Sequence, residues 1–186
     1  MQKNNTTQAA LANATSAIDA SRHFPKNVFC GEWGSCFFFD SDRMFDPEFV
    51  EKIKALLEIE SSMHACMSNL DKSSDEERTS FFFNREMAGQ TYQAFLAGPK
   101  AGDGWIYAVD RFGCASDAGQ WCMYCERRNE MAVIVFRKDC SLERYKPVIA
   151  QLKALPIKEA LDLPLTYGFG HLSPEWYRDL IKHYAN

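Results

Sequence analysis

The stretch Gly104–Arg137, GWIYAVDRFGCASDAGQWCMYCERRNEMAVIVFR, carries the clearest strand pattern of the chain. Its apolar segments are rich in aromatic and β-branched residues, and polar or glycine-containing stretches separate them. This pattern predicts a three-strand antiparallel meander. Its strands are expected at Trp105–Asp110, Gln120–Glu126 and Met131–Arg137, with a loop at Arg111–Gly119 between the first two.

The second and third segments form the clearest hairpin of the chain. Residues 121–125 (WCMYC) and 131–136 (MAVIVF) are apolar at every position, so both faces of each strand are apolar. Such strands are typical of a sheet that is covered on two sides. The polar connection between them contains Asn129, a residue that tolerates the left-handed backbone conformation of a tight reversal.

Capping patterns predict the surrounding helices. Asp46-Pro47-Glu48 combines a capping acid, a proline at the first helical position and a carboxylate in the first turn. Further helices are expected from Ser73-Ser74 at capping-box spacing, from Lys146 and from Ser173-Pro174. The predicted spans are 46 to about 59 or on through Met67, 75 to Leu96, 146 to Pro156, and 173 to Tyr184; residues 28–40 are read as a bent strand or short hairpin, and 157–172 as turn and loop.

These elements predict an α+β fold, an antiparallel sheet with a central meander flanked by four to five helices. The length of 186 residues suits one domain with a substantial core. We expect residues 1–22 to be a flexible or weakly helical N-terminal arm, because they are rich in Ala, Asn, Thr and Ser. Residues 23–186 are expected to form a single α+β domain.

The net charge of −4 is unevenly distributed, and residues 40–80 alone hold 11 acids and 5 bases. This balance argues against a nucleic-acid partner, because such proteins usually present a basic face. A solvated helix start would explain the acidic stretch Asp71, Asp75, Glu76 and Glu77. A functional interpretation is that they steer a basic protein partner. The candidate partner-binding residues are Asp40, Asp42, Asp71, Asp75, Glu76 and Glu77.

The N-terminal residues lack the apolar core of a signal peptide, and no apolar run is long enough to span a bilayer. We therefore expect a cytoplasmic protein without a membrane partner. The odd number of cysteines, seven, then indicates reduced and mostly buried thiols. No cofactor is predicted, and the sequence does not set the oligomeric state.

Two cysteine arrangements offer chemistry as alternatives to burial. Cys122-x-x-Cys125 could be half of a zinc site or a redox pair, but residues three apart on a regular strand face opposite sides. Cys114 could be a nucleophile assisted by a histidine, with His171 the best candidate. Asp40, Asp42 and Asp46 do not form an EF-hand, because the central glycine and the closing glutamate are missing.

Residues 104–110 and the hairpin 121–136, followed by the closing LSPEWY helix from Leu172, resemble the immunity proteins encoded beside bacterial secreted or polymorphic toxins. The resemblance covers residues 104–186 and transfers no residue role. It implies a non-enzymatic inhibitor that caps the active site of a cognate toxin inside the producing cell. The alternatives are a thiol-dependent enzyme using Cys114 and a histidine, and a small metal-binding regulatory domain using Cys122 and Cys125.

Overall fold

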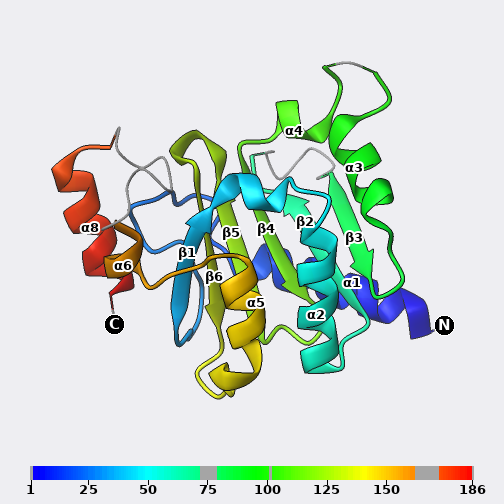
Figure 1. The fold of residues 1–186 in the computed structure, drawn as a ribbon, viewed down its shortest axis with the longest axis horizontal. Helices are drawn as coiled ribbons and strands as arrows, with labels where there is room; N and C mark the ends of the chain where they lie inside the picture. Colours follow the sequence, from blue (N-terminus) through cyan, green and yellow to red (C-terminus); the bar gives the residue numbers. More distant parts are fainter. Residues whose placement is uncertain (1, 72–78, 101, 162–171, 186) are drawn as a thin grey trace.

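A six-stranded antiparallel sheet forms the centre of the molecule, as the computed structural model shows for residues 2–71, 79–100, 102–161 and 172–185 (Figure 1). Its strand order is β1-β6-β5-β4-β2-β3. The strands are β1 (Cys36–Asp40), β2 (His64–Asn69), β3 (Ser80–Asn84), β4 (Arg111–Ser116), β5 (Trp121–Glu126) and β6 (Met131–Phe136). The expected α+β class with an antiparallel sheet and a central meander, β4-β5-β6, is confirmed.

Seven α-helices accompany the sheet in the described part of the chain, against the four to five expected. They are α1 (Gln2–Ser16), α2 (Phe49–Glu60), α3 (Gly89–Ala97), α4 (Trp105–Ala108), α5 (Lys146–Gln151), α6 (Ile157–Leu161) and α8 (Pro174–Tyr184). The number exceeds the expectation because α4 and α6 are helices of four and five residues inside segments that the sequence indicated as strand and loop.

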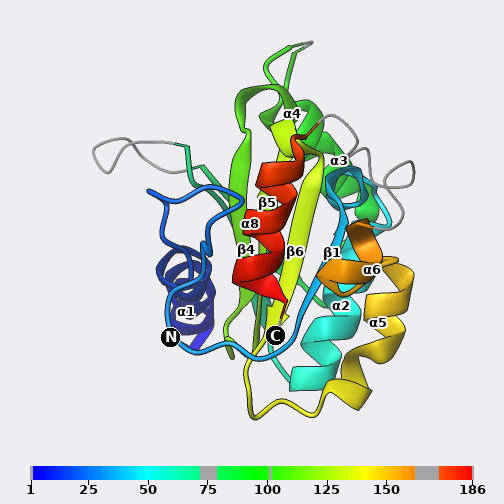
Figure 2. The ribbon, with the colours of Figure 1, turned by 90° about the vertical axis from the view of Figure 1, so that its left-hand side faces the viewer.

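Helices cover both faces of the sheet (Figure 2). Helix α1 lies on one side, hereafter the α1 face, while α2 and α5 lie on the other, the α2 face. Helix α8 lies beyond the β1 edge (Figure 1). There the Tyr184 hydroxyl accepts a hydrogen bond from the Val28 amide at 3.1 Å and donates one to the Lys26 carbonyl at 3.0 Å. Because helices cover both faces of the sheet, every residue of strands β2, β4, β5 and β6 is buried.

The β5–β6 hairpin is confirmed, with its registered pairs running from Trp121 opposite Phe136 to Glu126 opposite Met131. Its reversal differs from the expectation in one detail. The left-handed residue is Glu130, with φ of 53°, and not Asn129. Asn129 instead lies in a 3-10 turn and donates from its side chain to the Glu126 carboxylate at 2.7 Å.

The first strand of the meander was wrongly placed. Residues 105–108 form helix α4, and the expected loop 111–119 contains strand β4. Trp105 packs between the rings of Phe95 and Phe112, at centroid distances of 5.2 and 5.4 Å, so its aromatic character serves tertiary packing. Gly113 lies in β4, and a Cβ there would stand 2.6 Å from the Ala14 carbonyl oxygen, because α1 approaches the strand closely.

The helix expected over 75–96 is confirmed only in its C-terminal part, where α3 ends at Gly98 as expected. Residues 80–84 form edge strand β3, and the helical part begins only at Gly89. Its expected start at Asp75 lies outside the described residues. The helix after Asp46-Pro47 is confirmed but runs from Phe49 to Glu60 and ends at a left-handed Ser61, so the alternative extension through Met67 is wrong and β2 occupies that region.

The remaining predicted elements are close to their observed positions. The helices after Lys146 and after Ser173-Pro174 are confirmed. The N-terminal residues 2–16, expected as a flexible or weakly helical arm, form α1, whose Ala10 and Ala14 are fully buried against the sheet. None of the helices in the described ranges has the length and apolar character that a bilayer-spanning segment requires.

Candidate functional site

The acidic candidates that the structure describes gather at one end of the sheet but not in one patch. Asp40 ends β1 and Asp71 follows β2 by two residues, and antiparallel pairing brings both strand ends to the same side. Strands β6, β5 and β4 separate them, so at about 4.8 Å per strand step the two positions lie roughly 19 Å apart. Asp75, Glu76 and Glu77 lie outside the described residues.

Asp40 and Asp42 differ in exposure although they are neighbours. The Asp40 carboxylate accepts the Asp42 amide at 2.8 Å and thereby caps the 3-10 helix Ser41–Met44. Partial burial raises the pKa of Asp40 above its usual range. Asp42 is exposed, so its charge is available to a partner. Of this pair, Asp42 is the more exposed residue.

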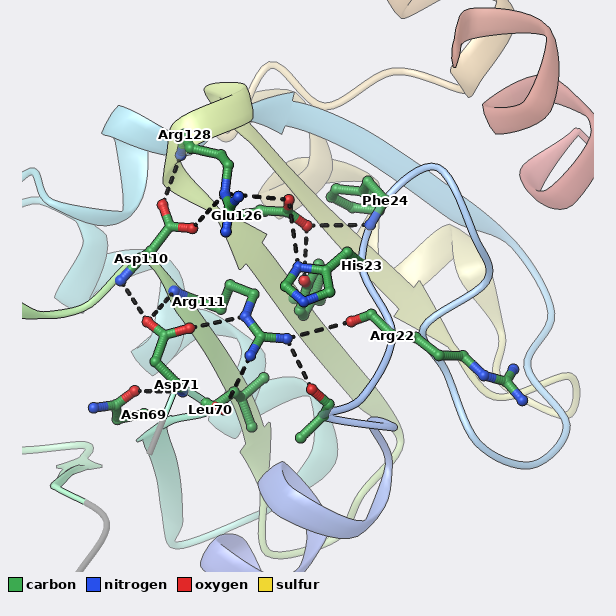
Figure 3. Close-up of polar contacts among 12 residues, drawn as sticks. Arg22, His23, Phe24, Asn69, Leu70, Asp71, Asp110, Arg111, Glu126 and Arg128 are labelled. Carbon is green, nitrogen blue, oxygen red and sulfur yellow. Dashed lines mark hydrogen bonds and ion pairs between the residues drawn. The ribbon is translucent and has the colours of Figure 1, made fainter. Parts of the chain in front are cut away.

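Asp71 is tied to Arg111 and the start of β4 (Figure 3). Its Oδ1 accepts from Arg111 Nε at 2.8 Å, and its Oδ2 accepts the backbone amides of Asp110 and Arg111 at 2.7 and 2.9 Å. The Arg111 side chain is only 10% exposed, and its Nη1 donates to the Ala20 carbonyl at 2.8 Å. The structure therefore gives Asp71 a role within the fold.

Glu126 is the most buried charge of this region, at 2% exposure. It lies opposite Arg111 in the β4–β5 register, and both side chains point to the α1 face (Figure 3). Its Oε2 accepts the Phe24 amide at 3.1 Å and the Tyr124 hydroxyl at 2.9 Å, while Oε1 accepts from Asn129. Burial, followed by the adjacent Glu126 charge, raises the pKa of Tyr124 well above its usual range, so its hydroxyl remains a donor.

Together, Asp71, Arg111 and Glu126 hold the segment that follows α1 onto the sheet. Arg111 binds the carbonyl oxygen of Ala20, and Glu126 binds the amide of Phe24. The Phe24 ring then packs edge-on against Tyr124 at 5.0 Å and against Tyr184 of α8 at 5.8 Å. We call these three residues the anchor network. Its polar atoms bond to backbone groups and side chains of the same chain, so the network stabilises the fold.

Exposed residues lie just outside the anchor network. Tyr107, on α4, is 71% exposed and is one of two exposed large hydrophobic side chains in the described part of the chain, with Met63. The Arg128 side chain is 63% exposed and pairs with Asp110 at 2.9 Å. Asp110 hydrogen-bonding and charge raise the pKa of Arg128. We define the sheet-end surface as the residues Asp42, Tyr107, Asp110, Arg128 and Glu130.

The backbone beneath Tyr107 is fixed by a second arginine. Arg127 Nη1 donates to the carbonyl oxygens of Ile106 and Val109, the latter at 3.3 Å, and its guanidinium lies 4.7 Å from the centre of the Phe45 ring. Between Tyr107 and Arg128 lies an open hollow of about 410 Å³, which Asp71 and Asp110 also line. The surface thus presents an exposed aromatic ring on a held backbone, beside charged groups and a depression.

The candidate nucleophile Cys114 does not have the environment of a reactive thiol. It is fully buried in β4, and burial raises its pKa well above the usual range. A neutral thiol inside the core is a poor nucleophile. The suggested partner His171 lies outside the described residues. Of the described histidines, His64 is buried and its Nδ1 lies 2.9 Å from the Thr6 hydroxyl oxygen.

Cys122 and Cys125 lie on the regular strand β5 and therefore point to opposite faces of the sheet. Both are fully buried, and burial raises the pKa of each thiol. Within the described ranges, His, Cys, Asp and Glu side chains form no group of three or more that could hold a metal ion. All seven cysteines are free thiols.

The chain matches no family model, no curated protein and no solved structure. Its function must therefore be argued from its own residues.

Sequence reasoning missed Arg111, Glu126 and Tyr107 as notable positions. Arg111 was placed in a loop and Tyr107 in a strand, where it would have been half-buried. One signal could have revealed Glu126. Alternation places it on the same face as Tyr124 and Cys122 in an otherwise apolar strand, and a carboxylate at such a position requires buried donors.

Proposed function

We propose that this protein is a non-enzymatic cytoplasmic binding protein, an immunity protein that inhibits a cognate bacterial toxin by occluding the toxin's active site. The sheet-end surface would contact the toxin. Tyr107 carries the proposal, because a tyrosine that is 71% exposed on a held backbone can bury its ring against a partner, and tyrosines are enriched among interface hot spots.

The charges of the sheet-end surface suit a basic partner. Asp42 and Glu130 are exposed acids, Asp110 is a third acid, and Arg128 is the single base of the surface. An excess of acid accelerates association with a basic surface, while an arginine beside a tyrosine is a frequent contact residue in interfaces. Occlusion requires only shape and charge complementarity, which fits a chain whose buried thiols are neutral.

The proposal is tested by capturing the partner from the native cell with tagged wild-type protein and identifying it by mass spectrometry. We expect one stoichiometric protein that is toxic when expressed alone and harmless when expressed with this chain. A captured protein whose toxicity is unchanged by co-expression would contradict the immunity function. A homogeneous protein that retains no stoichiometric partner would contradict it as well.

A further inference from the structure

The two edge strands of the sheet, β1 and β3, differ in what pairs with their outer sides. On β1, the Phe38 amide donates to the Leu155 carbonyl at 2.7 Å, and the Leu155 amide donates to the Phe38 carbonyl at 2.9 Å. The segment around Leu155 therefore occupies the centre of the β1 edge. At the opposite edge, β3 is the last strand, and β2 is the only strand paired with it among the described residues.

The outer side of β3 has an open backbone position at its central residue, Phe82, whereas the Asn84 carbonyl already accepts the Met87 amide at 3.3 Å. The Asn69 amide donates to the Thr79 carbonyl at 3.1 Å, which fixes which residues face β2. Because alternate residues of an antiparallel strand bond to opposite sides, Phe81 and Phe83 also face β2, and Phe82 faces outward. No described residue pairs with the backbone N–H and C=O of Phe82.

The sequence of β3, Ser-Phe-Phe-Phe-Asn, lacks the usual protection of an edge strand. It contains no charge, no proline and no glycine, whereas exposed edges are commonly blocked by lysine, proline or a bulge. Phe82 is half-buried and projects to the α1 face, since it lies opposite Cys66 in the register. A strand of this composition pairs readily with another strand.

A hollow lies at the Asn84 end of β3 and the start of β2. Figure 1 shows α1 continuing past β3 towards the N-terminus, so the first turns of this helix extend beyond the sheet. This hollow of about 730 Å³ lies between these turns and the end of β3, lined by Asn5 and Thr6 of α1 and by Asn84. An additional strand would lie over the projecting part of α1, as β2 and β4 already do.

We propose that two copies of this chain associate through β3, pairing antiparallel about a two-fold axis at Phe82. In this register Phe82 lies opposite its equivalent, Phe81 opposite Phe83, and Ser80 opposite Asn84. The strand is thus complementary to itself, with aromatic facing aromatic, polar facing polar, and no like charges opposed. The two six-stranded sheets become one continuous sheet.

A second copy fits this edge better than an unrelated strand because the β3 pattern reads the same in both directions. An isologous interface must be self-complementary, and an outward-facing residue at the centre satisfies this requirement with two equivalent N–H···O=C bonds. The sheet-end surface is separate from this edge, since Tyr107 lies on α4 and Arg128 follows β5. The dimer can therefore be measured without the toxin.

The test is analytical ultracentrifugation of the wild-type protein over about 1 µM to about 1 mM, the range in which a small interface would form. We expect a reversible monomer–dimer equilibrium. Phe82→Lys should weaken it by 10-fold or more, and Phe82→Pro should abolish it, because this proline removes an N–H that is not bonded to β2. Tyr107→Lys, the matched control at an exposed aromatic, should leave it unchanged.

Amide hydrogen exchange of the wild-type protein keeps the test decisive if a variant does not fold. The Phe82 amide should exchange slowly at high concentration and rapidly at low concentration, while the Phe81 and Phe83 amides remain protected at both. A monomer over the whole range would overturn the proposal. So would a dimer in which the Phe82 amide stays open, or one that Phe82→Pro leaves intact.

Discussion

The anchor network and the sheet-end surface occupy the same end of the sheet but use charge in opposite ways. In the anchor network, Glu126 is 2% exposed and its oxygens receive three hydrogen bonds. On the sheet-end surface, Asp42 and Arg128 are exposed, and Tyr107 presents its ring to solvent. At this end of the sheet, the buried acidic side chains stabilise the fold, whereas the exposed acidic side chains are available to a partner.

Among the substitutions at this end of the sheet, Glu126→Ala is expected to lower the stability most. The change leaves the Phe24 amide, the Tyr124 hydroxyl and the Asn129 side chain without their acceptor. We expect a loss of about 3–5 kcal/mol in the free energy of unfolding, measured by urea denaturation. Glu130→Ala, which removes an exposed acid from the same hairpin, should change it by less than about 0.5 kcal/mol. Equal losses would remove the distinction.

A smaller effect is expected from Asp71→Asn. The asparagine side chain keeps one acceptor oxygen and replaces the other with an NH2 group. This group then faces a donor, either Arg111 Nε or the backbone amides of Asp110 and Arg111. The expected loss is about 1–3 kcal/mol by the same denaturation measurement. Asp42→Asn is the matched exposed control and should be nearly neutral. If Asp71→Asn were also neutral, Asp71 would belong with the surface residues.

Two neighbouring parts of the sheet differ in how far the sequence predicted them. The β5–β6 hairpin was correctly predicted because residues 121–136 form it by local pairing and are apolar on both faces. Strand β4 was missed because Gly113 and Ala115 carry little β propensity. Their small size is required by α1, which packs at van der Waals distance above Gly113. That requirement comes from a helix about a hundred residues earlier and cannot be seen locally.

Two other errors have similar causes. Residues 81–83 follow an acidic stretch at capping-box spacing, which favoured a helix, but the aromatic rings of Phe81 and Phe83 pack on Tyr92 of α3 from a strand. Helix α2 ends at Ser61 in the left-handed conformation, a position where glycine is the usual signal. Of the sheet-end surface, the sequence named Asp42 as a partner-binding candidate, a role that stays a prediction, while the exposure of Tyr107 depends on tertiary packing.

The pH dependence of stability tests the environment of Glu60. Burial raises the pKa of Glu60, with hydrogen bonds from Ser116 and Ser62 only partly opposing it. The protonated Glu60 side chain therefore contributes its full stabilisation below about pH 4.3, the ordinary pKa of glutamate. This stabilisation is lost as the pH rises through the raised pKa of the folded state. The unfolding free energy of Glu60→Gln relative to wild type should rise from pH 4 to pH 7.

Thermal unfolding at stepped pH values measures this difference. Glu58→Gln, which removes a charge from the exposed side of the same helix, is the matched control. A wild-type advantage that stays constant, or that grows towards pH 7, would contradict the raised pKa of Glu60.

A small kinetic effect is expected from Asp42→Lys. Reversing an exposed charge on the sheet-end surface should lower the association rate with the captured partner several-fold at low salt, with little change in the dissociation rate. Stopped-flow measurement at two ionic strengths checks this. Glu143→Lys, at the opposite end of the sheet, provides the control. Equal rates for Asp42→Lys and wild type at low salt would remove the steering role.

If the partner binds the sheet-end surface through Tyr107, isothermal titration of the captured partner with Tyr107→Ala must show a loss of affinity. Met63→Ala is the control, because Met63 is the other exposed large hydrophobic residue of the described chain, at 54%. We predict that Tyr107→Ala weakens binding by about 30-fold or more, the effect of losing a hot-spot residue, and that Met63→Ala does not. Unchanged affinity for Tyr107→Ala would contradict the account.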